Sequence, residues 1–161
     1  MIVKLAAKNA KCHGSRNESS LSDAGNSGVL RLHSVQNNDF QIVALPQFVE
    51  RRGTLLPFDF ETMPFIPKRV FVVNDVPAGT VRGQHAHRRG RQLLVRLAGE
   101  IRVEVRRHGR SKTVSLVNSR IGLLVPAGVW ASQTYVTSDS ALLVLCSEPY
   151  DSTSYTDANI A

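Results

Sequence analysis

The sequence predicts an all-β protein whose antiparallel strands form a sandwich or a jelly-roll barrel. Seven short apolar runs follow one another at intervals of about ten residues, and turn-forming residues such as Pro, Gly, Asn and Ser stand between them. One run, IRVEVRR at 101–107, alternates between apolar and charged residues, as a strand with one buried face does. No segment has the sustained apolar period of a helix. Many short strands at even spacing are typical of these two architectures.

The expected strands can be placed in chain order. The apolar runs are QIVAL (41–45), RVFVVNDV (69–76), QLLVRL (92–97), IRVEVRR (101–107), TVSLV (113–117), GLLVPAG (122–128) and ALLVLCS (141–147). QLLVRL and ALLVLCS are apolar on both faces, as inner strands of a packed sandwich are. Residues 52–57 are expected to form an extra edge strand near a partner subunit or the rim of a pocket. Residues 149–159 are interpreted as a polar tail with two tyrosines.

The first 38 residues differ from the rest of the chain. The stretch KCHGSRNESSLSDAGNSG is rich in Ser, Asn and Gly and has no apolar period, so we expect it to be disordered. The predicted organisation is therefore a flexible N-terminal extension over 1–38 and one folded domain over 39–161.

The charge of the chain limits its partners. A formal net charge of +7 indicates a protein that attracts anions. Nucleic acid is not an expected partner, because the basic residues form no long run and do not alternate with stacking aromatic residues. The apolar run at the N-terminus is too short for a signal peptide or a membrane span, and the two cysteines suggest no disulfide framework. We therefore expect a cytoplasmic protein with no membrane partner.

The stretch GTVRGQHAHRRGRQLLVRLAG at 79–99 has the strongest chemical signal. Side chains alternate across a strand, so His85 and His87 are expected on the same face. Two adjacent imidazoles can ligate a metal, or they can transfer protons, because an unperturbed histidine titrates near pH ~6.5. A pair of histidines that only form hydrogen bonds at a strand end is the plain alternative.

Several blocks of the sequence, in their order along the chain, resemble the bacterial dTDP-sugar 3,4-ketoisomerases, which are cupin enzymes of deoxysugar biosynthesis. These blocks are IPKRVFVV (66–73), RGQHAH (82–87), Gln92, VPAGVW (125–130) and VLCSEPYDSTSY (144–155). The resemblance covers residues 39 to about 155. It implies a cupin-type jelly-roll barrel, a homodimer that exchanges strands, and a dTDP-linked 4-keto-6-deoxyhexose as substrate. It also implies a reaction without a metal or other cofactor.

The spacing of the histidines resembles the first motif of metal-binding cupins, where a glutamate stands at the position of Gln92. A second cupin motif places a further histidine three residues after Pro-x-Gly, and this chain has Ala131 there. Two imidazoles and an amide are a weak donor set for zinc or non-haem iron. A metal-dependent cupin, such as a dioxygenase or a sugar-phosphate isomerase, therefore remains the less favoured alternative. A non-catalytic cupin that binds nucleotide sugars is the other.

The resemblance implies that His85 and His87 are the acid–base pair that moves the keto group from carbon 4 to carbon 3 through an enediol. The sequence does not decide which of the two acts on carbon 3; we favour His85 there, with His87 acting on carbon 4. Arg82 and Gln92 are the candidates that would hold the negative charge of the enolate. Each such acid or base typically contributes ~10²–10⁴-fold to the rate.

Four further residues are candidates for substrate binding. A guanidinium can bind two phosphate oxygens at once, so Arg69 and Arg102 are candidates for binding the pyrophosphate. The alternative for Arg102 is that its side chain lies on a strand face exposed to solvent. Arg52 would reach the nucleotide site of a neighbouring subunit. Trp130 would form a wall of the sugar pocket or close the core. The sequence also departs from the family: Phe71 stands where tyrosine is frequent, and Ala131 and Ser132 stand where arginine and glutamate are expected, which bears on substrate identity.

Overall fold

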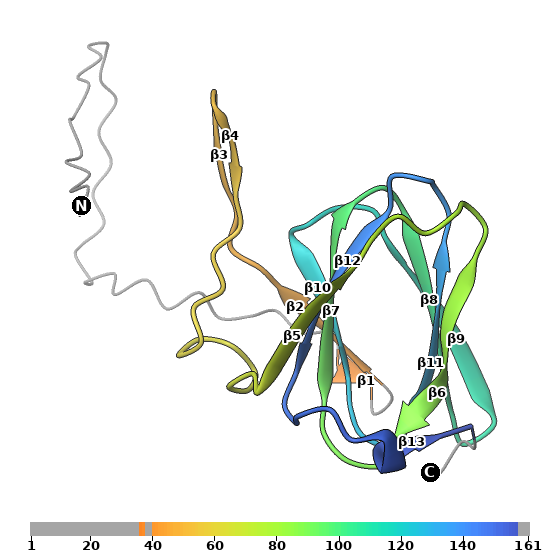
Figure 1. The fold of residues 1–161 in the computed structure, drawn as a ribbon. Helices are drawn as coiled ribbons and strands as arrows, with labels where there is room; N and C mark the ends of the chain where they lie inside the picture. Colours follow the sequence, from red (N-terminus) through yellow and green to blue (C-terminus); the bar gives the residue numbers. More distant parts are fainter. Residues whose placement is uncertain (1–35, 38–39, 158–161) are drawn as a thin grey trace, which may run out of the picture. The chain divides into compact units, whose positions relative to one another are not determined.

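The computed structural model describes residues 36–37 and 40–157, and their main strands form two antiparallel sheets that face each other (Figure 1). The six-stranded sheet has the order β1 (Gln36–Asn37), β2 (Phe40–Ala44), β10 (Ile121–Val125), β7 (Gln92–Ala98), β12 (Ala141–Cys146) and β5 (Arg69–Val73). The five-stranded sheet has the order β13 (Tyr155–Thr156), β6 (Val81–His87), β11 (Trp130–Tyr135), β8 (Ile101–Arg107) and β9 (Arg110–Leu116). All seven predicted runs contain a strand, and the prediction of an all-β fold is confirmed.

The space between the two sheets holds the main hydrophobic core. Leu94 and Val144 enter it from the six-stranded sheet, and Ile101, Val103 and Val105 enter it from β8. These three residues of β8 are buried there, whereas Arg102 and Arg106 point away from the core. The alternation of IRVEVRR thus places one face of the five-stranded sheet in the core and leaves the other exposed to solvent.

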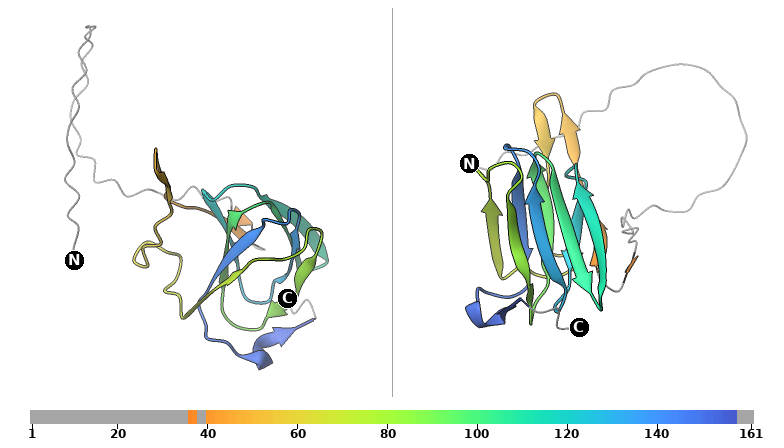
Figure 2. Two further views of the ribbon diagram at one scale, coloured as in Figure 1. Left: turned by 45° about the horizontal axis from the view of Figure 1, so that its top comes forward. Right: turned by 90° about the vertical axis from the view of Figure 1, so that its right-hand side faces the viewer.

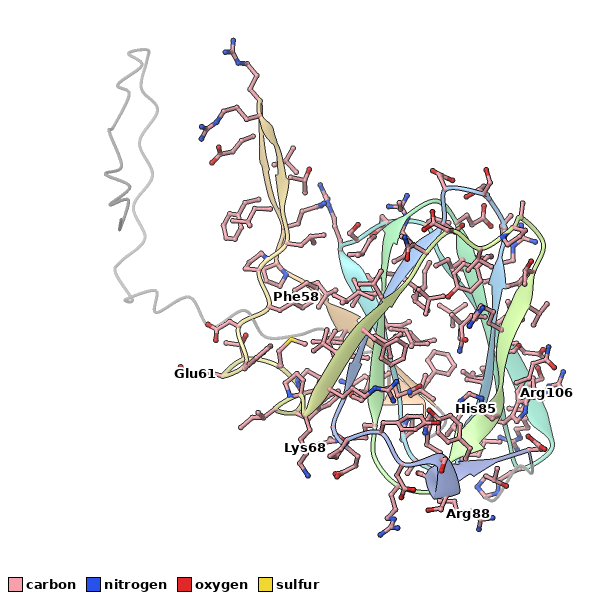
Figure 3. The ribbon with its side chains drawn as sticks, viewed as in Figure 1. Phe58, Glu61, Lys68, His85, Arg88 and Arg106 are labelled. Carbon is pink, nitrogen blue, oxygen red and sulfur yellow. The ribbon has the colours of Figure 1, made fainter. Side chains whose placement is uncertain are left out.

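A second hydrophobic cluster lies on the outer face of the six-stranded sheet. Leu93 and Leu145 belong to it, and the connection between β4 and β5 covers it with side chains that include Phe58, Met63 and Phe65. This cover explains why β7 and β12 are apolar on both faces: each packs against the core on one side and against the connection on the other. Figure 3 shows Phe58 on this side of the molecule.

A hairpin separate from both sheets precedes this connection. β3 (Phe48–Glu50) pairs only with β4 (Gly53–Leu55), and the hairpin extends away from the sheets (Figures 1 and 2). Its apolar side chains are largely exposed: Phe48 by 57%, Val49 by 67% and Leu55 by 62%. The expected edge strand at 52–57 is therefore wrong in one respect, because β4 extends neither main sheet and pairs with its own neighbour instead.

The C-terminal stretch is folded rather than a tail. Residues Ser152–Ser154 form a short 3-10 helix, and Tyr155–Thr156 form β13, which pairs with the end of β6. The interpretation of residues 149–159 as a polar tail is thus wrong for the part that the structure describes. Of the predicted flexible extension over 1–38, only Gln36 and Asn37 are among the described residues, and they pair with β2. In the described part of the chain, no helix has the length and apolar character needed to cross a membrane.

Candidate active site

β6 places both candidate histidines on the inner face of the five-stranded sheet. His85 pairs with Ala131 across the ladder, and Ala131 belongs to the core, so His85 and His87 face the space between the sheets. The centroids of the two imidazole rings lie 5.0 Å apart with their planes at 78°. Figure 3 shows His85 on this inner side, whereas Arg106 lies on the outer side. The sequence prediction that the two rings share a face agrees with this geometry.

A β-bulge precedes the histidines in β6. Ala131 pairs with His85, but the next residue of β11 pairs with Gly83, so Gln84 is the extra residue. Gly83 and Gln84 both have positive φ, at 80° and 61°. The additional residue restores Arg82 to the face of the strand that carries the two imidazoles. Burial raises the pKa of the Tyr135 phenol to about 12, although the positive charge of the nearby Arg82 acts in the opposite direction.

The bulge also orients His85. Its Nδ1 atom lies 2.9 Å from the carbonyl oxygen of Gly83. Because a carbonyl oxygen only accepts hydrogen bonds, Nδ1 carries a hydrogen and donates it. In the neutral imidazole the lone pair is then on Nε2, which is the atom able to accept a proton from a ligand.

His87 is held in its neutral form. Burial, the neighbouring His85 and the guanidinium of Arg69 together lower the pKa of His87 to about 4, with burial the largest cause. Its Nε2 atom is buried without a hydrogen-bond partner among the described residues. A buried polar atom of this kind is costly unless a ligand or water pairs with it. His87 therefore offers an unused hydrogen-bonding atom inside the site.

The opposite wall comes from the six-stranded sheet. Cys146 pairs with Arg69 on one side and with Gln92 on the other, so the three side chains lie in one row on the inner face. The amide of Gln92 donates to the sulfur of Cys146 over 3.7 Å. Burial raises the pKa of the Cys146 thiol, although this hydrogen bond and the charge of Arg69 act in the opposite direction. The thiol therefore stays protonated near neutral pH.

The C-terminal segment forms a third wall. Asp151 caps the short helix by accepting from the backbone of Thr153, and the backbone N–H of Arg88 donates to Ser154 over 2.8 Å. Tyr155 then pairs with His87 across the ladder. The Tyr155 ring centroid lies 4.6 Å from that of His85 and 4.7 Å from that of His87. Sequence reasoning missed this tyrosine, because the segment around it has no strand alternation.

These three walls enclose a cavity of about 300 Å³. Two carboxylates line it, and each has a cationic partner: Glu148 lies 2.9 Å from Lys68, and Asp151 lies 3.8 Å from Arg89. Among the described residues, Arg69 and Arg91 have no carboxylate partner, so they give the cavity a positive charge. The lining residues are Arg69, His87, Arg89, Gly90, Arg91, Gln92, Cys146, Glu148, Pro149, Asp151, Ser154 and Tyr155.

Three residues expected at the site lie elsewhere. Trp130 and Arg102 are on the outer face of the five-stranded sheet, because their partners across the ladder are Ala86 and Arg106 for Trp130 and Ser115 for Arg102. There the guanidinium of Arg106 lies 4.3 Å from the Trp130 ring centroid, and Arg102 pairs with Glu100 at 3.0 Å. Because strand alternation points Trp130 and Arg102 away from the cavity, the prediction that they bind substrate in this subunit is corrected.

Arg52 is the third residue outside the cavity. It is at the turn of the β3–β4 hairpin, where its guanidinium lies 3.7 Å from Glu50 and is largely exposed. Arg69 and Gln92, in contrast, both line the cavity. Arg82 and His85 lie on the same face of β6 as His87, but His87 is the only one of the three that lines the cavity.

The donor set of the site does not fit a metal ion. In the described part of the chain, no three His, Cys, Asp or Glu side chains gather in a ligand arrangement. Ala131, which has no donor atom, stands directly opposite His85, and the amide of Gln92 is turned toward Cys146. Catalytic zinc sites normally have three good protein donors, and non-haem iron sites need a carboxylate. We therefore derive no chemical step through a metal.

Comparison with known proteins decides the family. The model of the family described as "FdtA: WxcM-like, C-terminal" matches residues 38–159. The chain belongs to the FdtA family. A curated relative, the TDP-4-oxo-6-deoxy-α-D-glucose-3,4-oxoisomerase of Aneurinibacillus thermoaerophilus, is 31% identical over 116 residues, which are 71% of this chain and 84% of the relative.

Solved structures of FdtA-like enzymes have the same fold. The 3,4-ketoisomerase QdtA of Thermoanaerobacterium thermosaccharolyticum, in complex with TDP, is 28% identical with a TM-score of 0.71, over 74% of this chain and 88% of that chain. A mutant of QdtA has been solved in complex with TDP-4-keto-6-deoxyglucose, with a TM-score of 0.72. A 3,4-ketoisomerase of Helicobacter canadensis is 26% identical with a TM-score of 0.70, over 74% of this chain and 91% of that chain. The predictions of this family and of a cupin-type jelly-roll barrel are confirmed.

Proposed function

We propose that the chain is a 3,4-ketoisomerase that moves the keto group of a dTDP-linked 4-keto-6-deoxyhexose from carbon 4 to carbon 3. One observation carries the proposal: in a member of the FdtA family, His87 lines a cavity together with arginines that lack a carboxylate partner on the described chain, and the ring of His85 lies beside that of His87. The imidazoles supply the proton transfers, and the arginines supply the charge that a nucleoside diphosphate requires.

The reaction begins at carbon 3. The carbonyl at carbon 4 acidifies the neighbouring C–H, and His85 removes this proton with Nε2, the nitrogen left free by the hydrogen bond to Gly83. The negative charge that develops on the oxygen of carbon 4 is held by donors aimed at it, for which Gln92 and Arg82 are the candidates. The product of this half-reaction is an enediolate, which becomes the enediol when its oxygen is protonated.

The second half-reaction protonates carbon 4. We assign this step to His87, whose ring lies 5.0 Å from that of His85. The lowered pKa of His87, about 4, keeps the resting side chain neutral and makes its protonated form a strong proton donor. The two imidazoles thus act as a pair: His85 takes the proton of carbon 3 and passes it to the neutral His87 beside it, and His87 delivers it to carbon 4, so both rings return to their resting state.

The nucleotide end of the substrate is assigned to the cationic side of the cavity. Arg69 is held between two rings, with its guanidinium carbon 4.6 Å from the centroid of Phe71 and 4.8 Å from that of Tyr150. A guanidinium fixed in this way is pre-organised for a diphosphate, because little side-chain entropy remains to be lost. Arg91 is stacked on Phe65 at 5.4 Å and is the second candidate.

We further propose a homodimer. The β3–β4 hairpin exposes Phe48, Val49 and Leu55, of which Phe48 and Leu55 are paired across the hairpin, and exposed apolar side chains that gather on one face mark interaction surfaces. A second copy that covers the hairpin would also bring Arg52, which does not line the cavity of its own subunit, toward a neighbouring one. Sedimentation equilibrium tests this proposal: a monomer at micromolar concentration contradicts it.

The function is tested by incubating the protein with dTDP-4-keto-6-deoxyglucose and following the sugar signals by NMR. A 3-keto product supports the proposal. Wild-type protein that binds TDP but leaves the proton of carbon 3 unexchanged in D₂O is instead a non-catalytic binding cupin. Activity that is lost with a chelator and restored by one equivalent of iron, zinc or manganese favours the metal-dependent alternative.

A further inference from the structure

The proposed reaction requires proton transfers at oxygen as well as at carbon. Carbon 3 loses a proton and carbon 4 gains one, and the two imidazoles account for both transfers. In addition, the oxygen on carbon 4 changes from carbonyl to hydroxyl and gains a proton, while the oxygen on carbon 3 loses one. These two oxygen transfers need a group that first donates and then accepts a proton.

We infer that the hydroxyl group of Tyr155 carries the proton between the two substrate oxygens; this inference rests on the proposed function. The Tyr155 ring is within 4.6–4.7 Å of both imidazole rings by their centroids and lines the same cavity. β13 fixes its position, because Tyr155 pairs directly with His87. A substrate whose carbons 3 and 4 lie at the two imidazoles therefore presents the attached oxygens close to this phenol.

The Tyr155 hydroxyl is available for this role. It has no hydrogen-bond partner among the residues that the structure describes, whereas the amide of Gln92 already donates to Cys146. A phenol exchanges its proton far more readily than an amide does, and Tyr155 is the one phenol among the described lining residues.

The other aromatic residues nearby do not offer the same chemistry. Phe71, at the position where the resembling enzymes often have tyrosine, has no hydroxyl, and its ring packs under the guanidinium of Arg69. Tyr135 is buried in the core, and its pKa is raised to about 12. Tyr150 is 64% exposed and does not line the cavity. The C-terminal segment thus supplies a phenol to a site in which β5 supplies none.

The step balances. While His85 removes the proton of carbon 3, Tyr155 donates its hydroxyl proton to the oxygen on carbon 4, and the enediol and a phenolate result. When carbon 4 is protonated, the phenolate accepts the proton from the hydroxyl on carbon 3, and the new carbonyl forms there. The phenol is regenerated, no electrons leave the substrate, and no further reactant is consumed.

The test compares wild-type protein with Tyr155→Phe, which keeps the ring and removes the hydroxyl. Both are incubated in D₂O with dTDP-4-keto-6-deoxyglucose, and NMR follows 3-keto product and deuterium at carbon 3 of the remaining substrate. We expect product formation to fall by ~10²–10⁴-fold. TDP affinity, measured by calorimetry, should stay within about twofold, because the ring is still present.

The ratio of exchange to product gives the sharper readout. The enediolate can return to the 4-ketone without any proton transfer at oxygen, whereas product formation requires that transfer. In Tyr155→Phe the ratio of deuterium incorporation to product formation should therefore rise by at least about tenfold. Because both quantities come from one sample, the ratio does not depend on how much of the variant is folded.

Two results would overturn the inference: product formation within about threefold of wild type, or exchange and product formation that fall in parallel. The matched control is Tyr135→Phe, which removes a phenol hydroxyl in the core, outside the cavity, and should retain the wild-type ratio. If wild-type protein itself forms no 3-keto product, the proposed function fails first, and this outcome is distinct from an active wild type with an equally active Tyr155→Phe.

Discussion

β6 and the C-terminal segment bring the three reactive rings together, but the two regions are held in different ways. β6 pairs with β11 along most of its length on one side and with the two residues of β13 on the other. The C-terminal segment is attached by β13, whose two residues pair with β6, by the cap at Asp151 and by the bond from Arg88 to Ser154. The imidazoles therefore stand on a rigid strand, and the phenol stands on a segment with few attachments. This difference predicts how each region responds to substitution.

The largest effect is expected on β6. His85→Asn removes the base that acts on carbon 3 and keeps a polar side chain of similar size. Turnover should fall by at least ~10²–10⁴-fold with an unchanged fold. The NMR assay measures the rate, and circular dichroism measures the melting temperature. His108→Asn, in the exposed turn between β8 and β9, is the control and should leave the rate unchanged. A His85→Asn variant with near-normal turnover contradicts the role of His85.

The bulge is the next point at which β6 can be disturbed. In Gly83→Ala, the new Cβ would stand 2.6 Å from Oε1 of Gln133, on a backbone with φ of +80°. The carbonyl that orients His85 must then move, and turnover should fall by ~10–100-fold with little change in TDP affinity.

Gly109→Ala is the matched control for this change. Gly109 has a similar positive φ of +72°, but nothing lies within 4 Å of an added Cβ. It should lower the melting temperature without a comparable loss of turnover. Equal loss of turnover in both variants would mean that the bulge does not orient His85.

A smaller effect is expected when the C-terminal segment is loosened. Asp151→Ala removes the side chain that accepts from Thr153 over 2.9 Å and that pairs with Arg89. A lost cap costs ~0.5–2 kcal/mol, so Tyr155 should spend part of its time away from the imidazoles and turnover should fall by ~2–10-fold. Asp59→Ala removes a similar turn bond, to Glu61, in the connection between β4 and β5, and should leave turnover unchanged. Equal rates in both variants contradict the view that this cap holds the tyrosine in place.

The smallest effect concerns stability and pH. The folded protein lowers the pKa of His87 from 6.5 to about 4, so below pH 6.5 the unfolded chain binds a proton that the folded protein does not. Stability from this source is present above pH 6.5 and is lost as the pH falls toward 4. His87→Gln should therefore reduce the drop in melting temperature between pH 7 and pH 5 by roughly a few degrees. An identical drop in both proteins contradicts the low pKa.

The same two regions show what sequence reasoning can reach. The alternation of side chains along a strand was sufficient to place His85 and His87 on one face, and each of the seven apolar runs identified a strand, but none of them contains β11 or β13. Alternation also excludes Trp130 and Arg102 from the cavity, but only once their partners across the ladder are known. Sequence spacing alone does not say which face of a strand is the inner one.

Tyr155 was beyond sequence reasoning for a different reason. The residues around it, DSTSYTD, are polar and show neither a strand period nor a strong turn signal. Their position is decided by partners more than sixty residues away in the chain, namely Arg88, Arg89 and the end of β6. Contacts between residues so far apart in the chain cannot be inferred from the local composition of either segment.

The extra residue in β6 also affects how this sequence should be compared with others. Arg82 and His85 are separated by an odd number of positions, yet they share a side of the strand only because Gln84 is accommodated outside the ladder. An engineered deletion of Gln84 would turn the guanidinium of Arg82 to the outer face of the sheet and leave His85 and His87 on the inner face. An alignment that treats Gln84 as a gap would assign Arg82 to the wrong face in the same way. The side of β6 on which the guanidinium of Arg82 lies is thus set by one backbone insertion.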